Sequence, residues 1–239
     1  MNFKEVQVEL LGTFAISYLT MMGRITDDLN NNIYTTQTAI IAFFATLAFI
    51  LIGFPATKCN FTPIITLADA IFNKSDMQIA FIIMLTQLVG TFLAIGLIVI
   101  GLTDNQIDGL LTKSQLGFPY LRSLFDSTSG FFAQLIFSSV LVFLYLTLTN
   151  RKTAGKNWVE YYAVMRAILV GVASFAAESI CSLTLNPFET LAGALISTHF
   201  KQYQWIYFVP PIIGITIGGL AYNSVGVRKF FTSLKEKTD

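Results

Sequence analysis

Four long stretches of this chain contain no charged residue, and they constrain its fold more than any other feature. They span residues 29–57, 77–103, 127–150 and 202–227. Each is longer than the ~20 residues that a helix needs to cross the hydrocarbon core of a bilayer. Lipid cannot satisfy exposed backbone groups, so stretches of this kind cross as helices. The sequence therefore predicts an integral, multi-pass membrane protein, without specifying which membrane.

The composition excludes several classes of protein. Lysine and arginine number 15 against 14 aspartates and glutamates, which leaves a net charge of +1 and no basic surface for nucleic acid. The single histidine, His199, and two distant cysteines, Cys59 and Cys181, are too few for a metal site, and we expect no cofactor. The apolar segments hold almost no charge and offer no paired acids, so we expect neither an enzyme nor an active transporter.

Six apolar segments are long enough to span a bilayer, at residues 6–22, 37–54, 78–102, 131–149, 161–180 and 204–223. Glu9 and Arg166 are the only charges placed well inside them. An acid within a membrane segment is a candidate functional site, and bracing of a neighbouring loop is the role we favour for Glu9. Arg166 is expected to extend its side chain from a helix end towards the membrane surface.

Two further apolar segments, 63–72 and 187–197, are too short to cross, because ten or eleven helical residues reach only about 15 Å. Each begins with a capping residue and a proline, Thr62-Pro63 in the first and Asn186-Pro187 in the second. These pairs suit the N-cap and the first position of a helix. We therefore expect two half-membrane helices, with Thr62 acting mainly as a cap.

The two halves of the chain repeat one another. Corresponding residues lie 124 or 125 positions apart: Glu9 and Gln134, Thr62 and Asn186, Gly90 and Gly214. Three full crossings per half, an odd number, require the second half to lie upside down relative to the first. The sequence thus predicts a single all-α membrane domain over residues 1–239, with inverted repeats at approximately 1–110 and 125–230. The short helices would meet near the midplane, where carbonyls of the preceding loops line a path.

Five motifs occur in order along the chain, at residues 9–14 (ELLGTF), 62–68 (TPIITLA), 87–90 (QLVG), 185–192 (LNPFETLA) and 204–214 (QWIYFVPPIIG). Together they resemble the aquaporin, or major intrinsic protein, family over nearly the whole chain. The resemblance implies the aquaporin fold, with six transmembrane helices plus two half-membrane helices. It also implies a homotetramer or an aquaporin-type hetero-oligomer in the lipid bilayer, either alone or within a larger membrane complex.

Each short helix begins with a three-residue box that is Asn-Pro-Ala in the family. Here the first box is Thr62-Pro63-Ile64 and the second is Asn186-Pro187-Phe188. One of two paired asparagine amides is therefore replaced by a hydroxyl, which donates one hydrogen rather than two. Phe188 replaces a methyl group with a benzyl group where two helix ends approach, so we expect a narrower pore.

The resemblance also implies an outer filter, whose arginine normally stands three positions after the second asparagine. Here that position is Glu189, which reverses the sign of the filter. Two interpretations stay open: Glu189 faces the pore, or it reaches back to its own helix start in a capping box. The other filter positions align with Ser174 and with a residue near Ile40, within residues 40–43. Ser174 equally suits a close contact between helices.

Buried acids on the first and fourth long helices brace the pore loops in the family. Glu9 retains the first of these acids, whereas Gln134 stands at the second position. A carboxylate accepts loop amides more strongly than a neutral amide does. We therefore expect the loop next to Gln134 to be held less firmly.

These observations predict an aquaporin-like channel for passive passage of water or small uncharged solutes, with conduction reduced or altered. The alternative is a pore-inactive member kept as a structural subunit of a larger membrane assembly. Changes in both boxes, in the filter arginine and in one bracing acid favour this alternative, because polar pore positions are costly in lipid and easily lost.

Overall fold

The computed structural model describes residues 2–29, 36–103, 105–107, 119–121, 124–149, 158–198 and 200–225. These residues form helices and loops, and no strand occurs among them. His199 lies outside the described residues.

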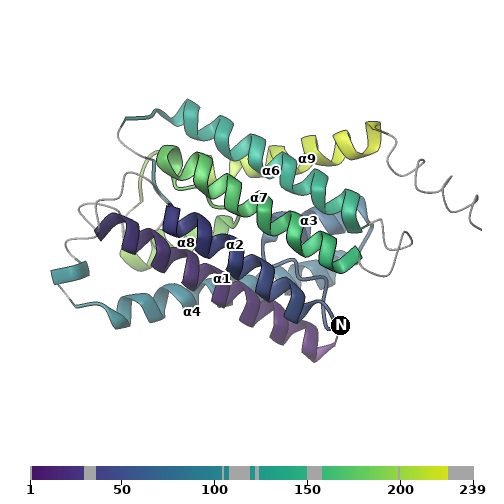
Figure 1. The fold of residues 1–239 in the computed structure, drawn as a ribbon, viewed down its shortest axis with the longest axis horizontal. Coiled ribbons are helices and arrows are strands. Elements are labelled where there is room, and N and C mark those ends of the chain that lie inside the picture. Colours follow the sequence, from purple (N-terminus) through teal and green to yellow (C-terminus); the bar gives the residue numbers. More distant parts are fainter. Residues whose placement is uncertain are drawn as a thin grey trace, which may run out of the picture.

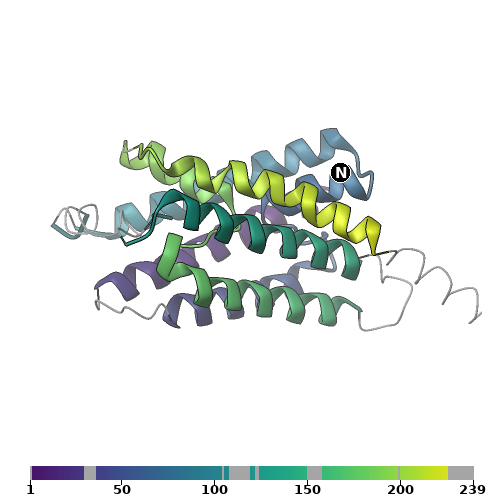
Figure 2. The ribbon, with the colours of Figure 1, turned by 90° about the horizontal axis from the view of Figure 1, so that it is seen from above.

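The helices follow the same order twice: two long helices, one short helix and one long helix. The first half contains α1 (Phe3–Leu29), α2 (Thr36–Gly53), α3 (Pro63–Phe72) and α4 (Met77–Gly101). The second half contains α6 (Ser127–Thr149), α7 (Trp158–Cys181), α8 (Pro187–Ser197) and α9 (Val209–Ser224), with the short η3 (Gln204–Tyr207) leading into α9. In Figures 1 and 2 the long helices run along one bundle, and α1 begins at the end where α9 finishes. This confirms the predicted set of six long and two half-length helices.

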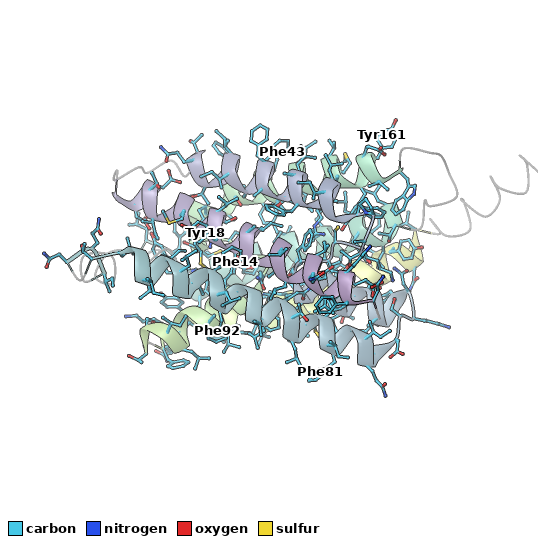
Figure 3. The ribbon with its side chains drawn as sticks, turned by 90° about the horizontal axis from the view of Figure 1, so that it is seen from below. Phe14, Tyr18, Phe43, Phe81, Phe92 and Tyr161 are labelled. Atoms are coloured by element: carbon cyan, nitrogen blue, oxygen red, sulfur yellow. The ribbon has the colours of Figure 1, made fainter. Side chains whose placement is uncertain are left out.

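The outside of the bundle is suited to lipid. Five helical segments are long and apolar enough to cross a membrane: 36–53, 77–101, 127–149, 158–181 and 204–224. α1 is longer than any of these, at 27 residues, but carries charged residues near both ends. Glu9, Arg24 and Asp27 of α1 are buried inside the bundle, whereas Phe81 and Tyr161 lie on its outer surface (Figure 3). The chain is therefore a multi-pass integral membrane protein.

The two short helices begin beside each other and extend away from the centre. Figure 1 shows α3 and α8 towards opposite ends of the bundle. α3 packs against α4, α6 and α9, and α8 packs against α4. A hydrogen bond from the Thr62 hydroxyl to the Leu185 carbonyl joins the residues that precede them. Irregular backbone thus lies at the centre, where protein rather than lipid surrounds it.

Each half packs its last long helix closely against its first. A Cβ atom at Gly90 of α4 would lie 2.8 Å from the Leu10 carbonyl oxygen of α1, and one at Gly214 of α9 would overlap the Ser138 hydroxyl of α6. Neither position has room for a larger residue. The repeated glycines therefore mark equivalent helix contacts in the two halves.

α1 extends further than its apolar segment. The segment 6–22 predicts an end near Met22, but the helix continues to Leu29. Its last turns are tied to the first turn of α2, because Asp27 Oδ2 accepts hydrogen bonds from the Thr38 backbone N–H (3.0 Å) and hydroxyl (2.7 Å). The extension keeps Arg24 inside the bundle, at 3% exposure.

Candidate functional site

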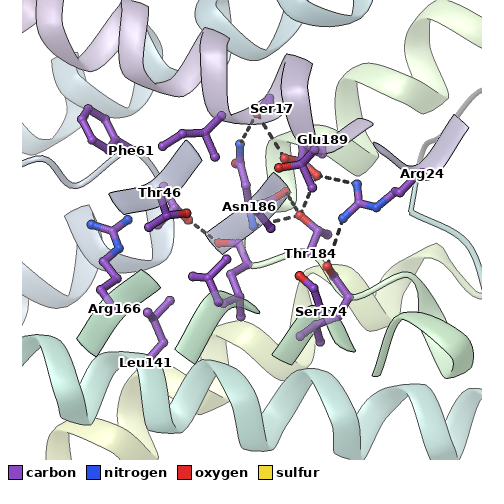
Figure 4. Close-up of a pocket in the computed structure, with 17 residues that line it drawn as sticks. Ser17, Arg24, Thr46, Phe61, Leu141, Arg166, Ser174, Thr184, Asn186 and Glu189 are labelled. Atoms are coloured by element: carbon purple, nitrogen blue, oxygen red, sulfur yellow. Dashed lines mark hydrogen bonds and ion pairs between the residues drawn. The ribbon is translucent and has the colours of Figure 1, made fainter. Parts of the chain in front are cut away.

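A cavity of about 60 Å³ lies where the two short helices begin. Its wall comes from α1, α2, α6 and α7, from the loops before α3 and α8, and from the first turn of α8. Figure 4 shows Arg166 and Arg24 at opposite ends of this site. The volume admits only a few water molecules.

The second box is built around Asn186. Its Oδ1 accepts a hydrogen bond from the Phe188 backbone N–H (3.2 Å), which caps α8, and Pro187 begins the helix. Its Nδ2 donates to the hydroxyls of Ser17 (3.3 Å) and Thr91 (3.2 Å). An amide nitrogen has two hydrogens, so both donors are used within the protein.

The first box differs in the role of Thr62. It stands at the N-cap position of α3, as expected, but its side chain makes no capping hydrogen bond and donates instead to the Leu185 carbonyl. Pro63 still begins the helix, and Ile64 is buried in the core beside it. The Thr62 hydroxyl thus ties the two box loops together across the cavity.

Glu189 is buried in the cavity wall and is paired with a cation. Its Oε2 accepts hydrogen bonds from Arg24 Nη1 (3.0 Å) and the Thr184 hydroxyl (2.9 Å), and its Oε1 accepts one from the Ser17 hydroxyl (3.1 Å). The Asn186 backbone N–H donates to the Thr184 hydroxyl rather than to Glu189. The capping-box interpretation of Glu189 is therefore corrected, since its oxygens bind across the helices.

Arg24 is the residue that the sequence interpretation missed. Its Nε donates to Glu178 Oε1 (2.8 Å), and its Nη2 donates to the Leu183 carbonyl (3.0 Å) in the loop before α8. Together with the Glu189 contact, these bonds hold the guanidinium between two buried carboxylates. An arginine therefore does stand at this end of the cavity, although it comes from α1 instead of the second box.

Arg166 also points inwards, contrary to the expected extension towards the membrane surface. It is 4% exposed and lines the cavity from α7. Its Nη1 donates to the Cys59 carbonyl and the Tyr162 hydroxyl, and its Nη2 donates to the Asn60 carbonyl. The guanidinium binds there because the loop offers two adjacent carbonyl groups.

Glu9 lies on the other side of the same loop. Its Oε1 accepts hydrogen bonds from the Asn60 N–H and the Thr57 hydroxyl, and its Oε2 accepts one from the Phe61 N–H, each 2.9 Å long. Gln87 Nε2 adds a fourth donor at 3.0 Å. The three donors from the loop hold it firmly against α1, and Gln87 joins the same carboxylate to α4.

Gln134, the counterpart of Glu9, holds no loop amide among the described residues. Its Nε2 donates to the Cys181 sulfur at 3.9 Å, and its buried Oε1 has no hydrogen-bond partner in the described part of the chain. The expected weak bracing by Gln134 is therefore corrected. Arg24 and the Thr184 hydroxyl contact the backbone of this loop instead.

The remaining filter residues are divided between the cavity and the exterior. Ser174 lines the cavity from α7 and is 4% exposed. Ile40 is 52% exposed and does not line it, whereas Ala42, within the predicted range 40–43, is buried in the cavity wall. Phe188 is half-buried and also lies outside the cavity wall, because the first turn of α8 directs Glu189 inwards instead.

The sequence profile of the major intrinsic proteins matches residues 2–222. The chain belongs to this family. Similar major intrinsic proteins include probable aquaporin NIP7-1 of Arabidopsis thaliana, which is 25% identical over 93% of this chain and 77% of its own length. Aquaporin A of Dictyostelium discoideum is 23% identical over 72% of this chain and 59% of its own.

The fold is also that of a solved family member. The X-ray structure of the aquaglyceroporin from Plasmodium falciparum superposes with a TM-score of 0.78 at 19% identity. The match covers 93% of this chain and 96% of the other. The likeness shows that this member of the family has the fold of that structure.

Proposed function

We propose that this chain is a low-conductance channel for water or small uncharged solutes. The observation that carries the proposal is the occupation of the carbonyl groups along the central path. Arg166 binds the carbonyls of Cys59 and Asn60, while Arg24 binds that of Leu183. Backbone carbonyls along a pore bind the permeating molecule. Carbonyls that already accept hydrogen bonds from the protein bind it less well, which slows passage.

The central asparagine supports the same conclusion. Both hydrogens of the Asn186 amide bind hydroxyls of the protein, and Thr62 donates to the Leu185 carbonyl. Neither group is free to orient a molecule at the centre. Together with a cavity of about 60 Å³, this limits the path to small solutes in slow passage.

Stopped-flow measurement tests this proposal on purified protein in liposomes. Vesicles that contain the protein should shrink faster than empty vesicles after an osmotic step, and more slowly than vesicles with an orthodox aquaporin at equal protein density. Swelling in glycerol extends the test to the solute class named for the Plasmodium falciparum relative. Shrinkage as fast as that of the orthodox channel would contradict the low conductance.

A pore-inactive structural subunit is the second candidate. It is favoured by the arginines bound to the carbonyls of both box loops, because a closed path needs no further change to serve as a scaffold. Shrinkage no faster than that of empty vesicles, by correctly folded protein, would select this candidate over the channel.

We infer that the protein assembles as a homotetramer or an aquaporin-type hetero-oligomer, either alone or in a larger membrane complex. Family membership supports this inference, as do exposed apolar side chains on α2 and α7, among them Phe44, Val172 and Phe175. Native mass spectrometry from the membrane tests it: a monomer without partners would contradict the inference.

A further inference from the structure

We infer that the barrier to protons and cations in this pore is Arg166 on α7, rather than any residue of the second box. The inference rests on the proposed channel function and identifies the residue that sets its charge selectivity. Two arginines, Arg24 and Arg166, line the same cavity and differ in their partners.

At one end of the cavity the positive charge is neutralised. Arg24 contacts Glu178 at 2.8 Å and Glu189 at 3.0 Å, and all three side chains are at most 5% exposed. Two acidic side chains thus contact a single guanidinium. Such a cluster does not repel an approaching cation, so this end lacks the positive field of an orthodox filter.

At the other end the positive charge has no acidic partner. Arg166 makes no ion pair among the described residues. Its contacts are two backbone carbonyls and one tyrosine hydroxyl, and its buried Nε has no hydrogen-bond partner in the described part of the chain. A guanidinium cannot lose its proton in a protein, so this wall of the cavity stays cationic.

The nearest acid in the same loop network does not cancel this charge at the cavity. Glu9 binds the N–H groups of Asn60 and Phe61, whereas Arg166 binds the carbonyls of Cys59 and Asn60. Two successive peptide groups therefore lie between the carboxylate and the guanidinium. Arg166 lines the cavity, and Glu9 does not.

The backbone is shaped to allow this arrangement. Cys59 and Phe61, on either side of Asn60, both have a φ of 53°, in the left-handed region that non-glycine residues seldom adopt. This conformation directs neighbouring N–H groups to one side and carbonyls to the other, as in backbone nests that bind charge. Strain of this kind persists where the surroundings over-determine it, here through Glu9 and Arg166.

The position of Arg166 adds to the dipoles of the short helices. The N-terminus of each short helix carries about half a positive charge directed at the cavity. Arg166 adds a full positive charge on the side of α3, and the same guanidinium occupies the carbonyls that water would use. One residue thus both slows passage and excludes cations.

Four variants in proteoliposomes test the inference. Arg166→Gln and Arg166→Met remove the charge, Arg166→Lys keeps it, and Lys4→Met removes an exposed charge at the start of α1 as a control. Proton flux is measured with an enclosed pH-sensitive dye under an imposed potassium diffusion potential, and water flux by stopped flow in the same vesicles. Gel filtration and thermal unfolding establish that each variant is folded.

The neutral variants should raise proton flux by about tenfold or more, because a unit charge in a poorly screened wall dominates the field there. Arg166→Lys should keep proton flux near native while raising water flux. The lysine ammonium keeps the charge but cannot bind the two carbonyls with the planar geometry of a guanidinium. Lys4→Met should change neither. Folded neutral variants with native proton flux would overturn the inference.

Two further arms keep the test decisive. If neither neutral variant folds, Thr46→Asp places an acid in the same cavity wall and should raise proton flux with Arg166 intact, and an unchanged flux would overturn the inference. Native water flux equal to that of empty vesicles would reject the channel function itself. In that case the proton flux of Arg166→Gln is compared with that of the native protein. A higher flux would support the inference, and an equal flux would overturn it.

Discussion

The loops that lead into α3 and α8 occupy equivalent places in the two repeats, yet different chemistry holds them. The first loop is held from both sides, with Glu9 on its N–H groups and Arg166 on its carbonyls. In the second loop Arg24 holds one carbonyl, and the side-chain Oε1 of Gln134 accepts no hydrogen bond among the described residues. The Thr184 hydroxyl holds the loop from within.

The comparison shows that each loop depends on an arginine from the opposite repeat. Arg166 belongs to the second repeat and binds the first loop, while Arg24 belongs to the first repeat and binds the second. The backbone keeps the symmetry of the inverted repeat, whereas the charges do not. The second loop is therefore held although position 134 carries no acid, because Arg24 of α1 binds its backbone.

The largest effect is expected from Arg24→Met. The substitution leaves Glu178 and Glu189 buried without a cation, which should lower the free energy of unfolding by about 3–5 kcal/mol. Thermal or denaturant unfolding in detergent measures the loss. Combining Arg24→Met with Glu178→Gln and Glu189→Gln should recover much of the lost stability. An Arg24→Met protein as stable as the native protein would contradict the role of Arg24 in holding the second loop.

Glu9→Gln tests the first loop in the same assay. The N–H groups of Asn60 and Phe61 lose a charged acceptor, and we expect the free energy of unfolding to fall by about 1.5–3 kcal/mol. Glu160→Gln, on the exposed first turn of α7, is the matched control and should change stability by no more than about 0.5 kcal/mol. Equal losses in the two variants would contradict a special role for Glu9.

Gln134→Glu tests whether a carboxylate at position 134 can hold the second loop as Glu9 holds the first. The new acid would be buried beside Cys181 without a donor from the loop backbone, so stability should fall by roughly 1–3 kcal/mol. The measurement is again unfolding in detergent, with Gln134→Met as a neutral variant of similar length. A more stable Gln134→Glu protein would show that the backbone N–H groups of the second loop can reach position 134, as those of the first loop reach Glu9.

Thr62→Val removes the hydrogen bond between the two loops while keeping the shape of the side chain. Loss of its donor to the Leu185 carbonyl should cost about 1 kcal/mol of stability. Thr26→Val is a control, because that hydroxyl donates only within its own helix, to the Met22 carbonyl. A loss larger than that of Glu9→Gln would make the bond between the loops more important than the bracing of either.

The smallest effect is expected from Phe188→Ala, on water permeability. Its ring lies outside the cavity wall, so removing it should leave stopped-flow shrinkage unchanged. Ser174→Phe is the opposing control, because it places a ring within the cavity and should slow shrinkage. Faster shrinkage by Phe188→Ala would restore the sequence-based view that this ring narrows the pore.

Part of the site could have been read from α1. Glu9, Thr13, Ser17, Thr20, Arg24 and Asp27 follow one another at steps of three or four residues, and all are buried. A polar stripe at helical spacing in a membrane segment points to the interior of the bundle. It was missed because the apolar segment ends near residue 22, which placed Arg24 outside the membrane.

The sequence by itself determined the crossings, the two short helices and the inverted repeat. Lipid imposes these features locally, through apolar runs of a given length and through prolines at helix starts. Only the tertiary structure decided the partners of the charges. Arg24 meets Glu178 and Glu189 across 154 and 165 residues of sequence, and Arg166 meets the Asn60 carbonyl across 106. Such pairings depend on how each helix is rotated in the bundle, as the exposed Ile40 and the cavity-lining Ala42 also show. That rotation is set by packing between helices, which no single segment encodes.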